Sequence, residues 1–216
     1  MRSRIIRIAL KKNPLHLIIP LSVLYIVLPI IGYSTFHQSD IDKSMQTTIS
    51  AAQALLPLSC LLLPMTHFSI WFNPLGKEAL VSCSSNHRSC IGEIVCVCIC
   101  IAVALFLAFL LFSTFYGFLW LELIRLYAQC LFSVASYYLC TVLSGNVTLG
   151  ALPIAVYLLL CICLNDIPDY SIFFVLDLQN LAEYAQLGKY LSTYCISLFL
   201  IAGGAILEGK CLKRLK

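Results

Sequence analysis

Six strongly apolar runs alternate with short polar stretches along this chain of 216 residues. A helix of roughly 20 apolar residues crosses a hydrocarbon core about 30 Å thick, and most of these runs are close to that length. The pattern therefore predicts an all-α, polytopic integral membrane protein that forms a single transmembrane domain. The expected membrane-spanning helices cover residues 15–33, 51–72, 94–115, 118–143, 149–164 and 189–207.

The composition supports the same fold class. Hydrophobic residues make up 61% of the chain and charged residues only 11%, whereas soluble domains are about one-quarter charged. The formal net charge is only +4, so nothing in the charge balance indicates a nucleic-acid partner.

A basic segment, residues 1–13, precedes the first apolar run. If this segment is helical, Arg4, Arg7 and Lys11 share one face and apolar side chains lie opposite. Such a helix is suited to lie on an anionic membrane surface, so we expect these three residues to contact membrane lipids. The alternative is a disordered basic tail that only sets the orientation of the chain.

The distribution of basic residues predicts that orientation. Six spans place both termini and the loop at residues 73–92 on one side of the membrane. That side carries eleven of the fourteen Lys and Arg residues. By the positive-inside rule this side is cytoplasmic, and we expect the protein in the cell (plasma) membrane.

The loop at residues 73–92 contains the signals of a short helix. Asn73 is a good N-cap, and Pro74 fits the first helical position because its missing N–H is not needed there. Glu78 would lie early in this helix, where a carboxylate complements the helix dipole. The alternative is an ordinary loop between two spans.

A second unusual stretch is residues 165–188, which combine several carboxylates with an apolar centre. The stretch is too polar to cross the membrane and too apolar for a free loop. We expect an extracellular re-entrant or interfacial helix between the fifth and sixth spans.

Glu122 and Arg125 are the charged residues expected inside the fourth span, at i,i+3 spacing. Charges within a span indicate a functional site by default. Their place at the outer end beside Trp120 favours instead an interfacial ion pair.

The sequence offers no catalytic or metal site. Cys83, His87 and Cys90 supply only three zinc-type ligands at irregular spacing, which favours a plain loop. The other cysteines lie mostly in apolar runs, where cysteine behaves as a small hydrophobic residue. We therefore expect neither an enzyme nor a bound cofactor.

The layout resembles the membrane subunit of type-2 ABC exporters. Those permeases have a basic amphipathic helix, six spans, a cytoplasmic coupling helix between spans two and three, and re-entrant extracellular helices between spans five and six. The local match is residues 76–82, Gly-Lys-Glu-Ala-Leu-Val-Ser, followed by His87 and Arg88. The family often has a proline before that arginine, and this chain does not.

The resemblance implies a permease that dimerises with a second permease chain, identical or different, to form the pathway. A separate cytosolic ABC ATPase would power it, since this chain has no G-x-x-x-x-G-K-[ST] motif of its own. The residues expected to contact the ATPase are Leu75, Gly76, Lys77, Glu78, Leu80, Val81 and Arg88. The alternatives are a non-transporting membrane scaffold or immunity protein, and a small intramembrane enzyme.

Overall fold

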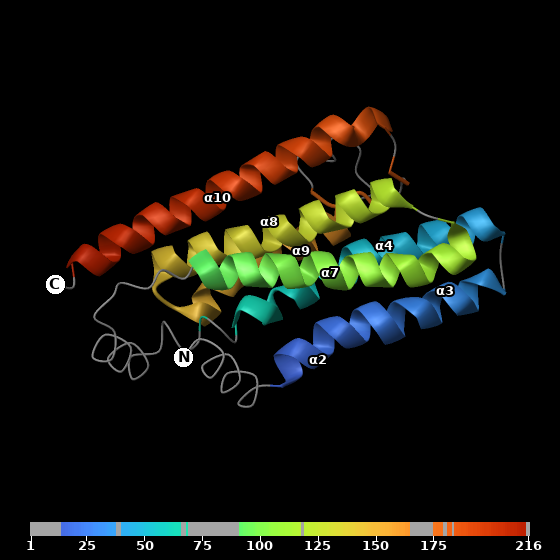
Figure 1. Cartoon of the computed structure of the whole chain (residues 1–216), viewed down its shortest axis with the longest axis horizontal. Coiled ribbons are helices and arrows are strands. Elements are labelled where there is room, and N and C mark those ends of the chain that lie inside the picture. The colour runs from blue at the N-terminus through green and yellow to red at the C-terminus, as the bar shows by residue number, and fades with distance from the viewer. Residues whose placement is uncertain are drawn as a thin grey trace.

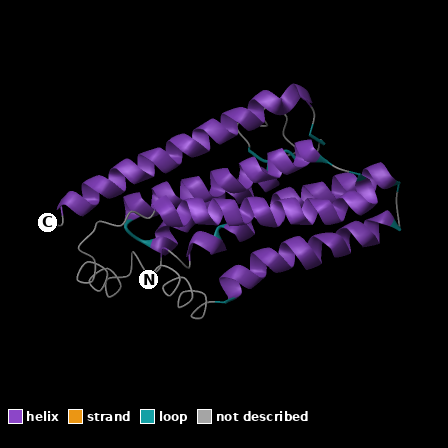
Figure 2. Cartoon of the chain, in the orientation of Figure 1, coloured by secondary structure: helices purple, strands orange, loops and turns teal. Residues whose placement is uncertain are grey.

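The computed structural model describes residues 14–37, 40–65, 68, 91–117, 119–164, 175–178, 181–182 and 184–214, with the backbone alone at 115, 185 and 210–214. These residues form helices and connecting turns, with no strand among them (Figure 2). Five helical segments are long and apolar enough to cross a membrane, namely Leu15–Phe36, Ile41–Met65, Ile91–Thr114, Trp120–Ser144 and Leu187–Gly209. The all-helical prediction is confirmed for this part of the chain, and the five segments indicate a membrane protein.

Helices run alongside one another with alternating direction (Figure 1). Their bounds are α2 Leu15–Ser22, η1 Val23–Val27, α3 Leu28–Phe36, α4 Ile41–Cys60, α7 Ile91–Tyr116, α8 Trp120–Ser144, α9 Val147–Cys163, η3 Tyr184–Gln186 and α10 Leu187–Arg214. Helix α9 is apolar but has only 17 residues. The start of α2, the start of α7 and the end of α10 lie at the same end of the bundle (Figure 1).

The first helical rod contains a short π-helix. Segment η1 joins α2 to α3, and Pro29 lies at the start of α3, where a missing N–H disturbs the helical ladder least. A π-helical turn is a local widening of an α-helix. The rod consequently continues to Phe36, beyond the boundary at residue 33 that the hydropathy pattern suggests.

Helix α4 begins ten residues before the expected second span, because polar residues at its start are used inside the fold. Ser44 is fully buried, and its hydroxyl hydrogen-bonds the hydroxyls of Thr35 and Tyr116 at 2.8 and 2.7 Å. Tyr116 also donates to the carbonyl of Gly32. This cluster joins α3, α4 and α7, so residues 41–50 are helical rather than a free polar connection.

Helix α8 is the centre of the bundle and packs against α4, α7, α9 and α10. A turn with a glycine at positive φ lies at each end of α8. Gly117 (φ +78°) follows α7 in the short turn that the sequence predicts there. Gly145 (φ +65°) caps the other end, and the Asn146 side chain then accepts hydrogen bonds from the first N–H groups of α9.

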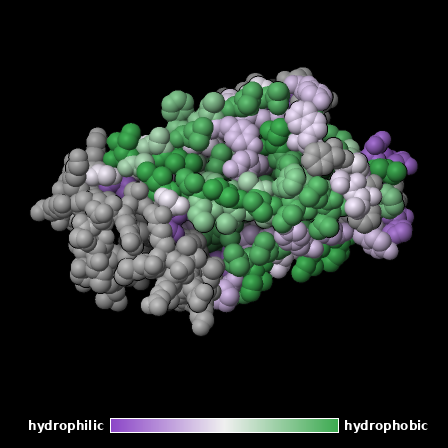
Figure 3. All heavy atoms as spheres, in the orientation of Figure 1, coloured by the Kyte–Doolittle hydropathy of each residue, from purple (hydrophilic) through white to green (hydrophobic). Residues whose placement is uncertain are grey.

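Apolar side chains cover much of the visible face, and hydrophilic ones gather at the end where α3 meets α4 (Figure 3). Phe199 on α10 is 78% exposed, and many Leu and Ile side chains on α7 and α10 are also exposed. Large exposed apolar faces on several helices suit contact with lipid rather than water.

Gly204 lets α10 approach α8 closely, as small residues do between membrane helices. A Cβ on Gly204 would lie 2.6 Å from Cε1 of the buried Tyr138, whereas one on Gly203 would meet nothing within 4 Å. Of these two neighbouring glycines, only Gly204 is therefore needed for the close contact between α8 and α10.

We predict that Gly204→Val weakens the α8–α10 contact by about 1–3 kcal/mol, because the ring of Tyr138 would have to move. Thermal unfolding of the purified protein in detergent would measure this loss. Gly203→Val is the matched control and should unfold near the wild-type temperature. Equal losses in both variants would contradict the close approach at Gly204.

Candidate functional site

Glu122 and Arg125 form an ion pair in the first turns of α8, with Nη2 of Arg125 2.5 Å from Oε2 of Glu122. Only 3% of Glu122 and 1% of Arg125 is exposed. The sequence correctly predicts the pairing. Both side chains are buried among the helices, in the first turns of α8 that follow Trp120. A buried charge pair is stable only when further polar groups complete its hydrogen bonds.

One such group belongs to the connection between α9 and α10. Residues 175–178 and 181–182, here named the strap, are neither helix nor strand. Oε1 of Glu122 accepts a hydrogen bond from the backbone N–H of Ala182 at 2.5 Å. Arg125 thus holds the carboxylate of Glu122, and that carboxylate holds one end of the strap.

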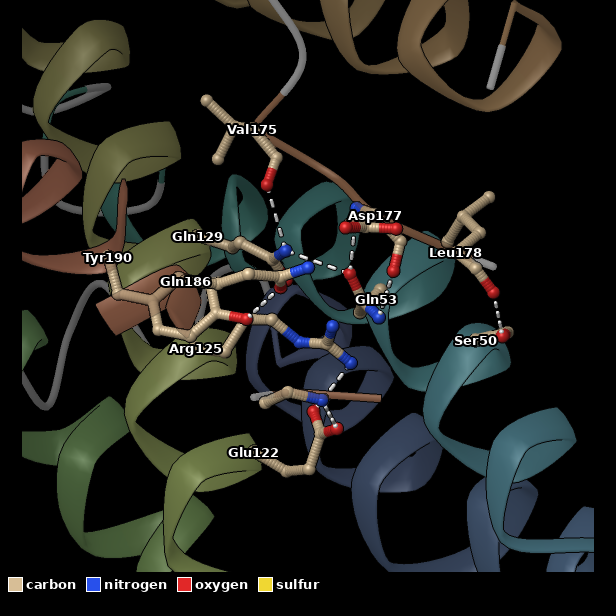
Figure 4. A network of polar contacts seen from close by, with 11 residues as sticks. Ser50, Gln53, Glu122, Arg125, Gln129, Val175, Asp177, Leu178, Gln186 and Tyr190 are labelled. Carbon is tan, nitrogen blue, oxygen red and sulfur yellow. Dashed lines mark hydrogen bonds and ion pairs between the residues drawn. The ribbon is translucent and has the colours of Figure 1, made fainter. Parts of the chain in front are cut away.

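Two glutamines hold the first residues of the strap (Figure 4). The Gln53 side chain donates to the carbonyl of Asp177 at 2.7 Å and accepts from the N–H of the same residue at 3.0 Å. Nε2 of Gln129 donates both to Oε1 of Gln53 and to the carbonyl of Val175, at 2.9 and 3.0 Å. Helices α4 and α8 are therefore joined to each other and to the strap by side-chain amides.

Three further contacts complete the attachment. The hydroxyl of Ser50 donates to the carbonyl of Leu178, and the hydroxyl of Tyr157 on α9 accepts from the N–H of Val175. The side chain of Leu176 is 98% buried in the apolar core. Each neutral hydrogen bond of this kind contributes about 1 kcal/mol net, so the strap is held by several modest interactions.

The strap extends well inside the bundle. At about 1.5 Å per residue, Gln53 lies about 18 Å along α4 from its start at Ile41, and Gln129 about 14 Å along α8 from Trp120. Both helices start at the same end of the molecule (Figure 1). At such depth in a membrane protein, irregular backbone is tolerated only where the protein itself satisfies its polar groups. Here the partners are four polar side chains of α4 and α8, namely Ser50, Gln53, Glu122 and Gln129.

Residues 165–188, where a re-entrant or interfacial helix is expected, are described only in part. The described residues of this stretch are the strap, the 3-10 turn η3 and the first two residues of α10, and the strap itself is not helical. The other residues of the stretch lie outside the described ones, so the expected helix stays a prediction. Side chains of α4 and α8 provide the strap with hydrogen-bond partners that a helix would find in its own backbone.

A second polar contact joins α8 and α10 near their opposite ends. The hydroxyl of Tyr138 donates to Oε2 of Glu208 at 2.6 Å, and Glu208 is 7% exposed. Glu208 belongs to α10, which continues to Arg214, beyond the expected end of the sixth span at residue 207. Nearby, the ring of Phe68 stacks on Tyr137 at a centroid distance of 5.5 Å.

The cavity between α4, α7 and α8 is small and apolar. It has a volume of about 20 Å³ and is lined by side chains such as Ile49, Leu56, Phe109 and Leu126. This volume suits about one water molecule, but the lining offers few polar partners to hold one. The cavity therefore has no room for a cargo molecule in this conformation.

The residues expected to contact an ATPase lie outside the described residues, as do the three expected to contact lipid. These are Leu75, Gly76, Lys77, Glu78, Leu80, Val81 and Arg88, and Arg4, Arg7 and Lys11. Cys83, His87 and Cys90 also lie outside them, and the described residues contain no group of His, Cys, Asp and Glu that could hold a metal ion.

No family model, curated protein or solved structure matches the chain.

Sequence reasoning missed Ser50, Gln53 and Gln129, because it searched the spans for charges. A usable signal was nevertheless present. Gln53 and Gln129 are amides within apolar runs, and a polar side chain inside a span usually faces the bundle interior and finds a partner there.

We predict that breaking the buried ion pair from one side destabilises the fold strongly. Arg125→Leu or Glu122→Leu alone should each cost about 3–5 kcal/mol, because the remaining charge stays buried without its partner. The double variant should cost much less than the sum of the two. Chemical unfolding of all four proteins in detergent would provide this double-mutant cycle.

Asp42→Leu serves as the control, since Asp42 is an exposed carboxylate in the first turn of α4. It should change the free energy of unfolding by no more than about 0.5 kcal/mol. Strict additivity of the Glu122 and Arg125 variants would mean that the two charges do not stabilise each other.

Proposed function

We propose that this chain is a permease subunit of an ATP-driven exporter of the type-2 ABC class. The observation that carries the proposal is the alternating direction of six helical rods, which puts the starts of α2 and α7 and the end of α10 at one end of the bundle (Figure 1). With six crossings, the basic residues of both termini and of the 73–92 loop gather on one side, as the positive-inside rule requires of a cytoplasmic side.

Two further features support the same class. The strap is bound on the side of the bundle where α8 and α10 begin, opposite the start of α7, and a re-entrant extracellular segment is expected there by resemblance. Helix α9 spans only about 25 Å at about 1.5 Å per residue, so the strap would complete the fifth crossing as irregular backbone.

In this proposal the protein resides in the plasma membrane with both termini in the cytoplasm. Residues 73–92 form the coupling helix, and Leu75, Leu80 and Val81 make an apolar anchor surrounded by Lys77, Glu78 and Arg88. An apolar centre with a charged rim is typical of protein interfaces. The partner is a cytosolic ABC ATPase, whose closure moves the spans, and a second permease chain completes the pathway.

We predict that a soluble P-loop ATPase copurifies with the protein in mild detergent. Reversing the charges of Glu78 and Arg88 together should reduce recovery of the ATPase at least about tenfold, since like charges across an interface cost several kcal/mol. Quantitative mass spectrometry of the purified complex would measure this recovery.

The matched control reverses Asp42 and Lys43, two exposed charges at the opposite end of the bundle. This control should recover as much ATPase as the wild type. A folded wild-type protein that recovers no ATPase would contradict the proposed function and favour a membrane scaffold.

We also predict the sidedness of two exposed positions. Lys43→Cys, in the first turn of α4, should react with a membrane-impermeant maleimide added to intact cells. Ser144→Cys, at the last residue of α8, should react only after the membrane is permeabilised. Peptide mass spectrometry separates these two labels from those on the native cysteines. The reverse pattern would invert the orientation, and equal labelling of both positions would contradict it.

A further inference from the structure

The strap is bound through its main chain. Six hydrogen bonds connect its N–H and C=O groups to side chains of Ser50, Gln53, Glu122, Gln129 and Tyr157. These six bonds use no side chain of the strap. Since every peptide offers the same main-chain groups, these six contacts do not depend on the strap's sequence. The buried side chain of Leu176 is the sequence-dependent contact beside them.

Gln53 is the clearest example. Its amide gives one hydrogen bond to Asp177 and takes one from the same residue. This reciprocal pair copies the exchange of two hydrogen bonds between opposite residues of antiparallel strands. The side chain of Gln53 therefore offers Asp177 the same donor and acceptor that a residue on a neighbouring antiparallel strand would offer.

The same surface contains a hydrogen-bond acceptor that no described residue uses. Gln129 is 2% exposed and uses Nε2 for both of its hydrogen bonds described above. Its Oε1 is buried and has no hydrogen-bond partner among the described residues. A buried carbonyl oxygen without a donor is costly, and a peptide N–H would satisfy it.

We propose that the faces of α4 and α8 at Ser50, Gln53, Glu122 and Gln129 form a binding site for the main chain of an extended peptide, and that the strap occupies this site in the present conformation. A peptide binds when the strap withdraws. The assignment of this peptide as the exported cargo rests on the proposed function, but the binding itself does not.

The burial of Leu176 explains why the site is closed here. Its side chain lies in the apolar core and ties the strap to the bundle, so replacing it should favour the withdrawn state. A soluble competitor with the sequence of residues 175–182, Val-Leu-Asp-Leu-Gln-Asn-Leu-Ala, can then take the same register.

The test measures binding of this peptide, blocked at both ends and carrying a fluorophore, to the full chain in lipid nanodiscs by fluorescence anisotropy. The Leu176→Ser chain should bind it about tenfold more tightly than the wild type. Gln53→Leu in the Leu176→Ser background should lose about tenfold in affinity, since it removes both hydrogen bonds to the main chain.

The matched control is the same peptide with an N-methyl group on its aspartate. This peptide keeps every side chain but lacks the N–H that Gln53 accepts, so it should bind about tenfold more weakly. Equal affinity for both peptides, or no binding to a folded Leu176→Ser chain, would overturn the proposal. If Leu176→Ser does not fold, Leu176→Ala, which shortens the same buried side chain without adding a polar group, takes its place under the same criteria.

The measurement uses no ATPase, so its result is separate from that of the copurification. Peptide binding without a copurifying ATPase would support the peptide site and contradict the exporter proposal. A copurifying ATPase without peptide binding would support the exporter proposal and contradict the peptide site.

Discussion

Peptide groups buried away from water need hydrogen-bond partners, and this requirement shapes the centre of the molecule. Helices satisfy the requirement internally, but the strap cannot. Its N–H and C=O groups are satisfied by Ser50, Gln53, Glu122, Gln129 and Tyr157, which come from three different helices. These polar side chains in turn require the helices to stay at fixed distances and rotations. The irregular segment and the regular bundle therefore stabilise each other.

Helix α8 carries most of this constraint. One part of it provides Glu122 and Gln129 to the strap, with Arg125 paired to Glu122, and a later part provides Tyr138 to α10. Lipid surroundings give no hydrophobic drive for helices to associate, so close packing and interhelical hydrogen bonds must hold them together. Gly204 packs closely against Tyr138, and the hydroxyl of Tyr138 donates an interhelical hydrogen bond to Glu208.

The sequence predicted much of the helical layout because apolar runs have a length that can be counted. It also found Glu122 and Arg125 as a pair. It misplaced the start of α4, since Ser44 and Thr48 look like loop residues until Tyr116 and Thr35 are seen beside them. It could not find the strap attachment, because the pairing of Gln53 with Asp177 joins positions far apart in the chain. Hydropathy along one segment carries no information about such a partner.

Helix α10 links the two ends of the bundle mechanically. At about 1.5 Å per residue its 28 residues make a rod of about 42 Å, longer than a hydrocarbon core of about 30 Å. One end follows the strap through η3, and the other carries Lys210, Lys213 and Arg214. Sliding of this rod along its axis would displace Leu187 and pull on the strap, and the strap's hydrogen bonds to α4, α8 and α9 would resist that pull. A force applied on one side of the membrane would thereby reach a peptide segment buried near the middle of α4.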